Sequence, residues 1–138
     1  MTTEKIFKTN SQFKTVTFDE STGSWNFIFE NKIYALSTGF WRIIKANRIV
    51  IVSFDNGHQF GQTKPLDLIE ETKKQLTGKK LEEIKIIKDT GDLILNISLG
   101  IRIEIYIAST GYETYEFEIE DKRFIGLGSG DIEIIDKK

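Results

Sequence analysis

The sequence predicts an α+β fold that is mainly antiparallel β, with two duplicated β-meanders related by a pseudo-two-fold and one amphipathic helix between them. The segment 91–119 shows the apolar alternation that is typical of three consecutive strands. The segment 23–44 is a looser copy of it, and a helical pattern separates the two. These three observations predict an architecture and say little about chemistry.

The duplication rests on a match without gaps, because the segment 16–36 falls on 84–104 when it is shifted by 68 positions. Val16 then meets Ile84, and the turn glycine Gly23 meets Gly91. The parity of the apolar positions is kept, which matters because a slip of one residue would turn every side chain to the opposite face. We therefore expect the two segments to superpose strand on strand.

The first repeat spans about 13–57 and follows a polar lead, 1–12, that we predict to be frayed. The residues from Ile49 to Val52 are apolar at every position, which favours an interior strand covered on both faces. The strands predicted in this repeat are 13–18, 25–29, 33–36, 41–45 and 48–54.

A helix is predicted over about 65–77, after the longest loop. Pro65 suits the first helical turn, where its missing N–H costs nothing, and Gly78 is a natural C-cap. An apolar stripe at helical spacing should pack on a sheet, and the charged side should face solvent. The stripe consists of Leu68, Ile69, Thr72 and Leu76.

The second repeat spans about 81–135. The whole chain has 138 residues, which is the size of a single domain. The inward positions of the two repeats should form one core that includes Trp25, Phe27, Leu93 and Leu95. The strands predicted in the second repeat are 81–88, 93–99, 101–107, 114–120, 123–127 and 131–135.

The composition excludes several classes of protein. Hydrophobic content of 39% and charged content of 29% are ordinary for a folded domain, and no apolar run approaches the ~20 residues of a membrane span. A net charge of −2 argues against nucleic-acid binding, which usually needs a basic surface. The absence of cysteine and of a signal-peptide pattern at the N-terminus favours the cytoplasm.

No catalytic or metal-binding constellation is recognisable. His58 is the only histidine, and nothing near it supplies the partner and nucleophile that a general base needs. The glycine-rich segment 126–130 is followed by strand alternation, whereas a phosphate loop leads into a helix. Asp89, Asp92 and Glu104 match no metal-loop spacing. The sequence therefore predicts neither an enzyme nor a metal or cofactor site.

Acidic residues provide the one candidate surface. Glu116, Glu118 and Glu120 alternate with apolar residues on one predicted strand, so that all three should lie on its outer face. Glu104, Asp131 and Glu133 would extend this surface if their strands are neighbours. Two interpretations are open. The acids form either a solvated face that blunts edge pairing or a patch that docks a basic protein.

The second repeat carries motifs that resemble a group of small uncharacterised bacterial domains. A G-D-L turn at 91–93, a Tyr-Glu-x-aromatic strand at 112–115 and a closing turn at 128–130 form the signature, and a helix ending in L-x-G-K lies at 76–79. Tyr115 stands where tryptophan is expected. Relatives of this type often look like immunity proteins, which implies a protein that binds and blocks one toxin. The resemblance supplies no catalytic residues.

We therefore expect a non-enzymatic protein-binding module, an immunity-like protein whose partner is a cognate bacterial toxin. Its acidic side chains would stand in for an anionic substrate and occlude the toxin's active site. The alternative is a small-ligand-binding or regulatory module with a pocket between the two meanders, lined by Trp25, Trp41 and Tyr106.

Overall fold

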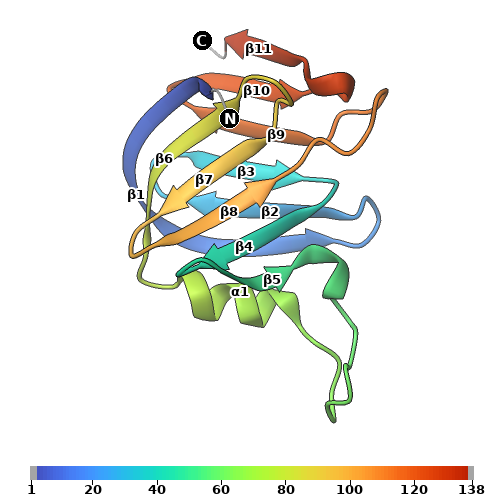
Figure 1. Ribbon diagram of the computed structural model, residues 1–138. Helices are drawn as coiled ribbons and strands as arrows, with labels where there is room; N and C mark the ends of the chain where they lie inside the picture. Colours follow the sequence, from blue (N-terminus) through green and yellow to red (C-terminus); the bar gives the residue numbers. More distant parts are fainter. Residues whose placement is uncertain (1–2, 137–138) are drawn as a thin grey trace.

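The computed structural model describes residues 3–136, which form a mainly antiparallel β fold with one short α-helix (Figure 1). This confirms the mainly antiparallel β character of the predicted fold and its one helix. The helix α1 is Leu68–Leu76, and two short 3-10 turns are η1 (Ser53–Asp55) and η2 (Gly128–Gly130). The strands are β1 (Thr3–Asp19), β2 (Ser24–Phe29), β3 (Ile33–Ser37), β4 (Trp41–Lys45), β5 (Arg48–Val52), β6 (Lys80–Ile87), β7 (Leu93–Ile97), β8 (Ile101–Ile105), β9 (Tyr115–Ile119), β10 (Lys122–Gly126) and β11 (Ile132–Asp136).

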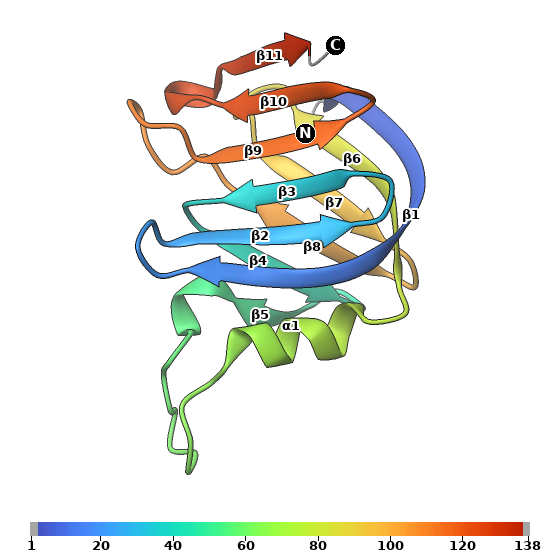
Figure 2. The ribbon, with the colours of Figure 1, turned by 180° about the vertical axis from the view of Figure 1, so that it is seen from behind.

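The strands follow one hydrogen-bonded order, β11-β10-β9-β3-β2-β1-β6-β7-β8-β4-β5. The long β1 belongs to both halves of this order, because residues 13–19 pair with β2 and residues 3–12 pair with β6. Strand β1 curves from one half to the other, and the sheet folds into two layers packed face to face (Figures 1 and 2). We call them the β9 layer, with β2, β3, β9, β10 and β11, and the β6 layer, with β6, β7, β8, β4 and β5.

The strands β1-β2-β3 and β6-β7-β8 pair in registers that differ by the same offset. Val16 lies opposite Phe27 in the first group, and Ile84 lies opposite Leu95 in the second, 68 positions further along for each member. The pairing of the third strand in each group is shifted in the same way. Both groups also contain a β-bulge at matching positions, between residues 13 and 15 and between residues 81 and 83.

The next hairpin of each half joins the opposite layer. Strand β4 pairs with β8, and β9 pairs with β3, so the hairpin β4–β5 extends the β6 layer and β9–β10 extends the β9 layer. The sequence pattern shows where strands begin and end but not which distant strand lies beside them. These two crossings therefore could not be foreseen.

The inner faces of the two layers form a single core. Trp25, Phe27, Leu93 and Leu95 are all buried, as predicted. Trp41 of β4 is also buried, and its ring packs edge-to-face on Phe27 with 4.9 Å between centroids. Burial alternates along β2, β3, β7 and β9, and the outward positions of β9 are acidic; Ser37 of β3 is a buried polar exception.

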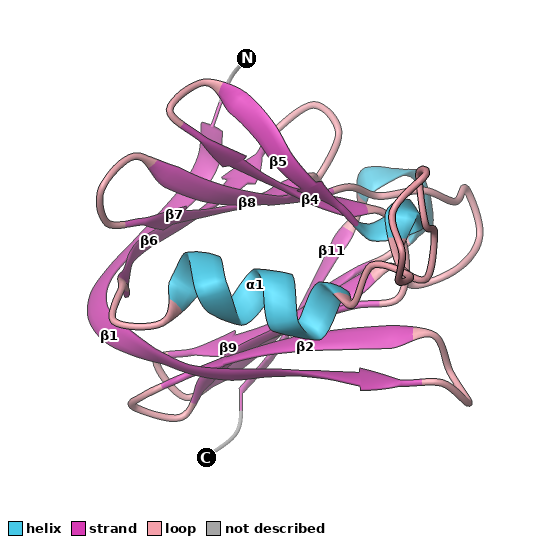
Figure 3. Ribbon diagram, turned by 90° about the horizontal axis from the view of Figure 1, so that it is seen from below, coloured by secondary structure: helices cyan, strands magenta, loops and turns pink. Residues whose placement is uncertain are grey.

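Helix α1 lies across the lower end of the sandwich, where it contacts β1 and β5 (Figures 1 and 3). It comes between β5 and β6 in the chain but is not plainly between two meanders in space. Asp67 is its N-cap, accepting hydrogen bonds from the amides of Ile69 and Glu70. Pro65 therefore precedes the helix, and its predicted place in the first turn is wrong. Gly78 follows the last turn with φ of 81°, as a C-terminal glycine should.

The predicted frayed lead is wrong within the described residues. Strand β1 already begins at Thr3 and pairs with β6 along most of this segment; Met1 and Thr2 lie outside the described residues. Phe7 supplies the anchor, because its ring packs on Phe117 and Phe124 of the β9 layer. One aromatic residue in a polar stretch gives no clear strand signal, so tertiary contacts decide the structure here.

The predicted interior strand at 48–54 is also wrong. Strand β5 ends at Val52 and lies at the end of the strand order, with Ile49 and Val50 exposed. A β-bulge opposite Ile43 and Ile44 interrupts its pairing with β4. A fully apolar run therefore does not prove that a strand is buried on both faces. In this structure, β5 is an apolar strand at an open edge of the sheet.

Candidate functional site

The outer face of β9 holds the first two predicted acids. Tyr115, Phe117 and Ile119 point into the core, so Glu116 and Glu118 lie on the opposite face, as the alternation predicted. Strand β9 runs between β3 and β10, and both neighbours place polar side chains beside these carboxylates.

Tyr34 of β3 and Arg123 of β10 hold the two carboxylates. The Tyr34 hydroxyl donates to Glu116 and, at 3.0 Å, to Oε1 of Glu118. The Nε of Arg123 lies 3.5 Å from Oε2 of Glu116 and 3.4 Å from Oε1 of Glu118. Burial and the bonds to both carboxylates raise the pKa of the Tyr34 phenol far above its usual value. The phenol therefore stays a proton donor across the physiological range.

Glu120 does not continue this row. Strand β9 ends at Ile119, and Glu120 lies with Asp121 in the turn to β10, where both residues have positive φ (57° and 61°). The turn nevertheless brings Glu120 back towards Glu118. Glu118, Glu120 and Asp121 line one hollow of about 330 Å³, together with two residues of the β2–β3 turn, Asn31 and Lys32.

A second hollow of about 360 Å³ continues from the first across β2 and β3. It shares Asn31, Lys32 and Glu118 with the first hollow but is mainly apolar. Asn26 also lines it, and the side-chain oxygen of this residue is buried without a hydrogen-bond partner. The acids thus border a concave, partly apolar surface.

Glu133 lies on the same outer face as Glu116. Asp131 does not lie on a strand. Glu133 of β11 is opposite Ile125, which is itself opposite Glu116, so Glu133 sits two strands from the centre of the row. Asp131 lies between η2 and β11, with its carbonyl accepting from the amide of Leu127. We define the acidic surface as Glu116, Glu118, Glu120, Asp121 and Glu133.

Glu104 belongs to a different site, on the β6 layer. Its carboxylate is almost buried and accepts hydrogen bonds from Nε of Arg42 (2.7 Å), Nε of Arg102 (2.6 Å) and the hydroxyl of Tyr106. Burial alone would raise the pKa of Glu104, but these three donors outweigh it and lower the pKa to about 2. Burial and the bond to Glu104 raise the pKa of Tyr106 to about 12. The expectation that Glu104 extends the β9 row is therefore wrong.

The predicted pocket between the meanders is not formed by its three proposed residues. The rings of Trp25 and Trp41 are in edge-to-face contact, with centroids 5.2 Å apart, and both are buried in the core. Tyr106 lies on the outer face of the β6 layer, beside Arg42. Aromatic residues fill this space, so they leave no room there for a ligand.

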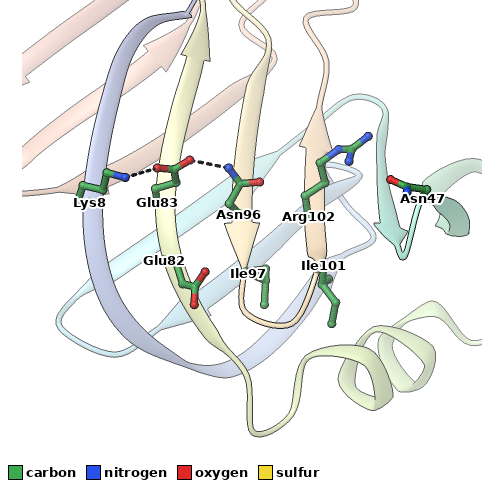
Figure 4. Close-up of a pocket in the computed structure, with 9 residues that line it drawn as sticks. Lys8, Asn47, Glu82, Glu83, Asn96, Ile97, Ile101 and Arg102 are labelled. Atoms are coloured by element: carbon green, nitrogen blue, oxygen red, sulfur yellow. Dashed lines mark hydrogen bonds and ion pairs between the residues drawn. The ribbon is translucent and has the colours of Figure 1, made fainter.

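A polar hollow of about 510 Å³ lies instead on the outer face of the β6 layer (Figure 4). Glu83 accepts from Lys8 at 2.9 Å and from Asn96 at 2.8 Å, and these bonds lower its pKa despite partial burial. Figure 4 shows the Arg102 guanidinium directed away from Glu83 and Asn96. The signal that could have revealed the hollow is the paired Glu82-Glu83, which the bulge in β6 places next to each other on the exposed side.

The remaining candidates behave as ordinary structure. His58 stacks on Phe60 in the exposed loop, and the glycine-rich segment joins β10 to β11 through η2, as the turn prediction required. Asp92 accepts a 2.9 Å bond from the amide of Ile107 and thereby fixes a turn. Within residues 3–136, no helix is long and apolar enough to cross a membrane.

Comparison with known proteins gives no match among protein-family models, curated proteins or solved structures.

Proposed function

We propose that this chain is a non-enzymatic protein-binding module, an immunity-like protein that binds and neutralises a cognate bacterial toxin. The observation that carries this proposal is the fixed position of Glu116 and Glu118, held by Tyr34 and Arg123 on the outer face. Carboxylates that are already ordered lose less side-chain entropy when a partner binds. Such a surface suits a basic partner.

The charge of the acidic surface also supports a basic partner. It has five carboxylates, and the four bases beside them are Arg123, Lys122, Lys32 and Lys14. Opposite potentials steer encounter and chiefly raise the association rate, while like charges reject wrong partners. In the proposed mechanism the carboxylates take the place of an anionic substrate, and the chain blocks the toxin by covering its basic site.

The pseudo-two-fold relation forms part of this proposal. We infer that β1-β2-β3 and β6-β7-β8 are copies, a view supported by their common offset of 68 positions and their matching bulges. Gly23 and Gly91 support it further, because they have φ of 72° and 75° in corresponding turns. The acidic surface lies on β9, the β9–β10 turn and β11, outside both copies.

A small-ligand-binding or regulatory module is the second candidate. The polar hollow of Figure 4 favours it, because the side chains of Lys8, Glu83 and Asn96 meet there in a hydrogen-bonded group. Genome neighbourhood separates the two candidates. An adjacent secreted toxin gene favours neutralisation, whereas a metabolic operon favours ligand binding.

Co-expression with the toxin encoded beside the gene tests the first candidate. The double variant Glu116→Gln with Glu118→Gln should lose protection of the host cell, while Glu70→Gln with Glu71→Gln on α1 should retain it. Urea unfolding of both variants checks that each is folded at the growth temperature. Protection that survives the β9 substitutions and is lost with the α1 substitutions would move the site to the helix. The absence of any neighbouring toxin gene would leave the ligand candidate in its place.

A further inference from the structure

The strand order leaves two open edges, and these differ in charge. Strand β5 ends the β6 layer and β11 ends the β9 layer. The hairpin from Trp41 to Val52 carries three bases and no acid; Arg42 is paired with Glu104 of β8, which leaves Lys45 and Arg48 for this edge. Residues 131–136 carry three acids and no base, although two lysines follow outside the described residues. One edge is thus basic and the other acidic.

Both edges also expose aliphatic side chains. Ile49 and Val50 of β5 are 54% and 42% exposed, and Ile134 and Ile135 of β11 are 45% and 38% exposed. An apolar strand with an unpaired edge is a template for another strand. The basic hairpin repels a second β5, and the acidic segment repels a second β11. Only the contact of β5 with β11 brings opposite charges together.

The fold itself shows which segment covers such an edge. Strands β5 and β10 hold corresponding places, because each is the outer strand of a hairpin whose inner strand pairs with the opposite meander. Strand β10 has its outer edge covered by β11. No strand covers β5 among the described residues. A strand with the chemistry of β11 is therefore the natural occupant of the β5 edge.

We propose that β5 of one molecule receives β11 of a second copy of this chain, in a head-to-tail contact. The two edges lie at opposite ends of the sandwich, so one molecule cannot join its own edges (Figures 1 and 2). Such a heterologous contact leaves a free edge at each end and allows further copies to add. The small net charge of −2 gives little general repulsion against this association.

The contact is short, so it should be weak and reversible. Only five residues of each strand can pair, which limits the buried area to the range of transient interfaces. Sedimentation velocity of the purified chain should show mass beyond a dimer as the concentration rises from about 10 μM towards 1 mM. Association should weaken when salt is raised, because the attraction is between exposed charges.

Two single substitutions block one edge each. Ile49→Glu places an acid on the β5 edge and should abolish self-association, and Ile134→Lys should do the same from the β11 edge. The matched controls are Leu99→Glu in the β7–β8 turn and Ile6→Lys on β1, which change exposed aliphatic residues away from both edges. Far-UV circular dichroism checks folding, and Arg48→Glu replaces Ile49→Glu if the latter is unfolded.

The decisive experiment mixes the two blocked variants in equal amounts. Each variant keeps one functional edge, so the mixture should associate although neither variant does so alone. A wild-type chain that stays monomeric throughout the concentration range overturns the proposal. Self-association that persists in both blocked variants, or a mixture that stays monomeric although the wild type associates, also overturns it, because the contact would then lie elsewhere.

Discussion

The Tyr115 hydroxyl donates a 2.7 Å hydrogen bond to the carbonyl oxygen of Gly91, and both residues are buried. The bond ties the first residue of β9 to the β6–β7 turn of the other layer. Gly91 has φ of 75°, and a Cβ at this position would lie 2.6 Å from the carbonyl oxygen of Gly130. Three segments therefore meet at one glycine, and a side chain at this position of the G-D-L turn would clash with Gly130.

Tyr115→Phe should lower the free energy of unfolding by about 1–2 kcal/mol, because it leaves the buried carbonyl of Gly91 without this donor. Equilibrium unfolding in urea measures the change. Tyr112→Phe is the matched control, since Tyr112 is exposed in the loop before β9, and its effect should be near zero. Equal effects of the two substitutions would mean that the hydrogen bond contributes nothing to stability.

Glu104 should make stability depend on pH in the acid range. Its pKa is lowered from 4.5 to about 2 in the folded chain, so its contribution is complete above pH 4.5 and is lost as pH falls towards 2. This contribution is on the order of 3 kcal/mol at neutral pH. Glu104→Gln should therefore destabilise the chain more at pH 7 than at pH 3. Glu120→Gln in the exposed β9–β10 turn is the control, and a pH-independent loss for Glu104→Gln would contradict the account.

Thr72→Val should stabilise the chain by up to about 1–2 kcal/mol, because it removes a buried hydroxyl that has no hydrogen-bond partner. The two side chains have the same shape and similar helix propensity, so packing on α1 is kept. Thermal and urea unfolding should agree on the sign. The same substitution at the exposed Thr77 provides the control. A clear loss of stability at Thr72 would show that a bound water satisfies the hydroxyl.

The local alternation of apolar and polar residues was sufficient to predict most of the strands. Tyr115, Phe117 and Ile119 are buried and Glu116 and Glu118 are not, as a period of two requires. All six strands predicted in the second half occur, within about two residues at each end. The core positions followed from the same pattern. In these regions local propensity and tertiary packing favour the same structure.

The contacts between distant segments could not be predicted from the sequence pattern. Phe7 makes the polar lead a strand only because Phe117 and Phe124 lie opposite it, more than a hundred positions away. Tyr34 reaches Glu116 only because β9 crosses to pair with β3. The acidic row was therefore predictable as a face, whereas the residues that hold it in place were not.

The association rate of the purified chain with the toxin of the neighbouring gene tests the proposed function most directly. Stopped-flow fluorescence at rising salt should show a steep fall in the rate constant, because exposed charges are screened beyond about 10 Å at 0.1 M salt. Glu116→Gln with Glu118→Gln should lower the rate at low salt and flatten its salt dependence, while Glu70→Gln with Glu71→Gln should change neither. A rate that is insensitive to salt and equal for all three proteins would contradict binding through the acidic surface.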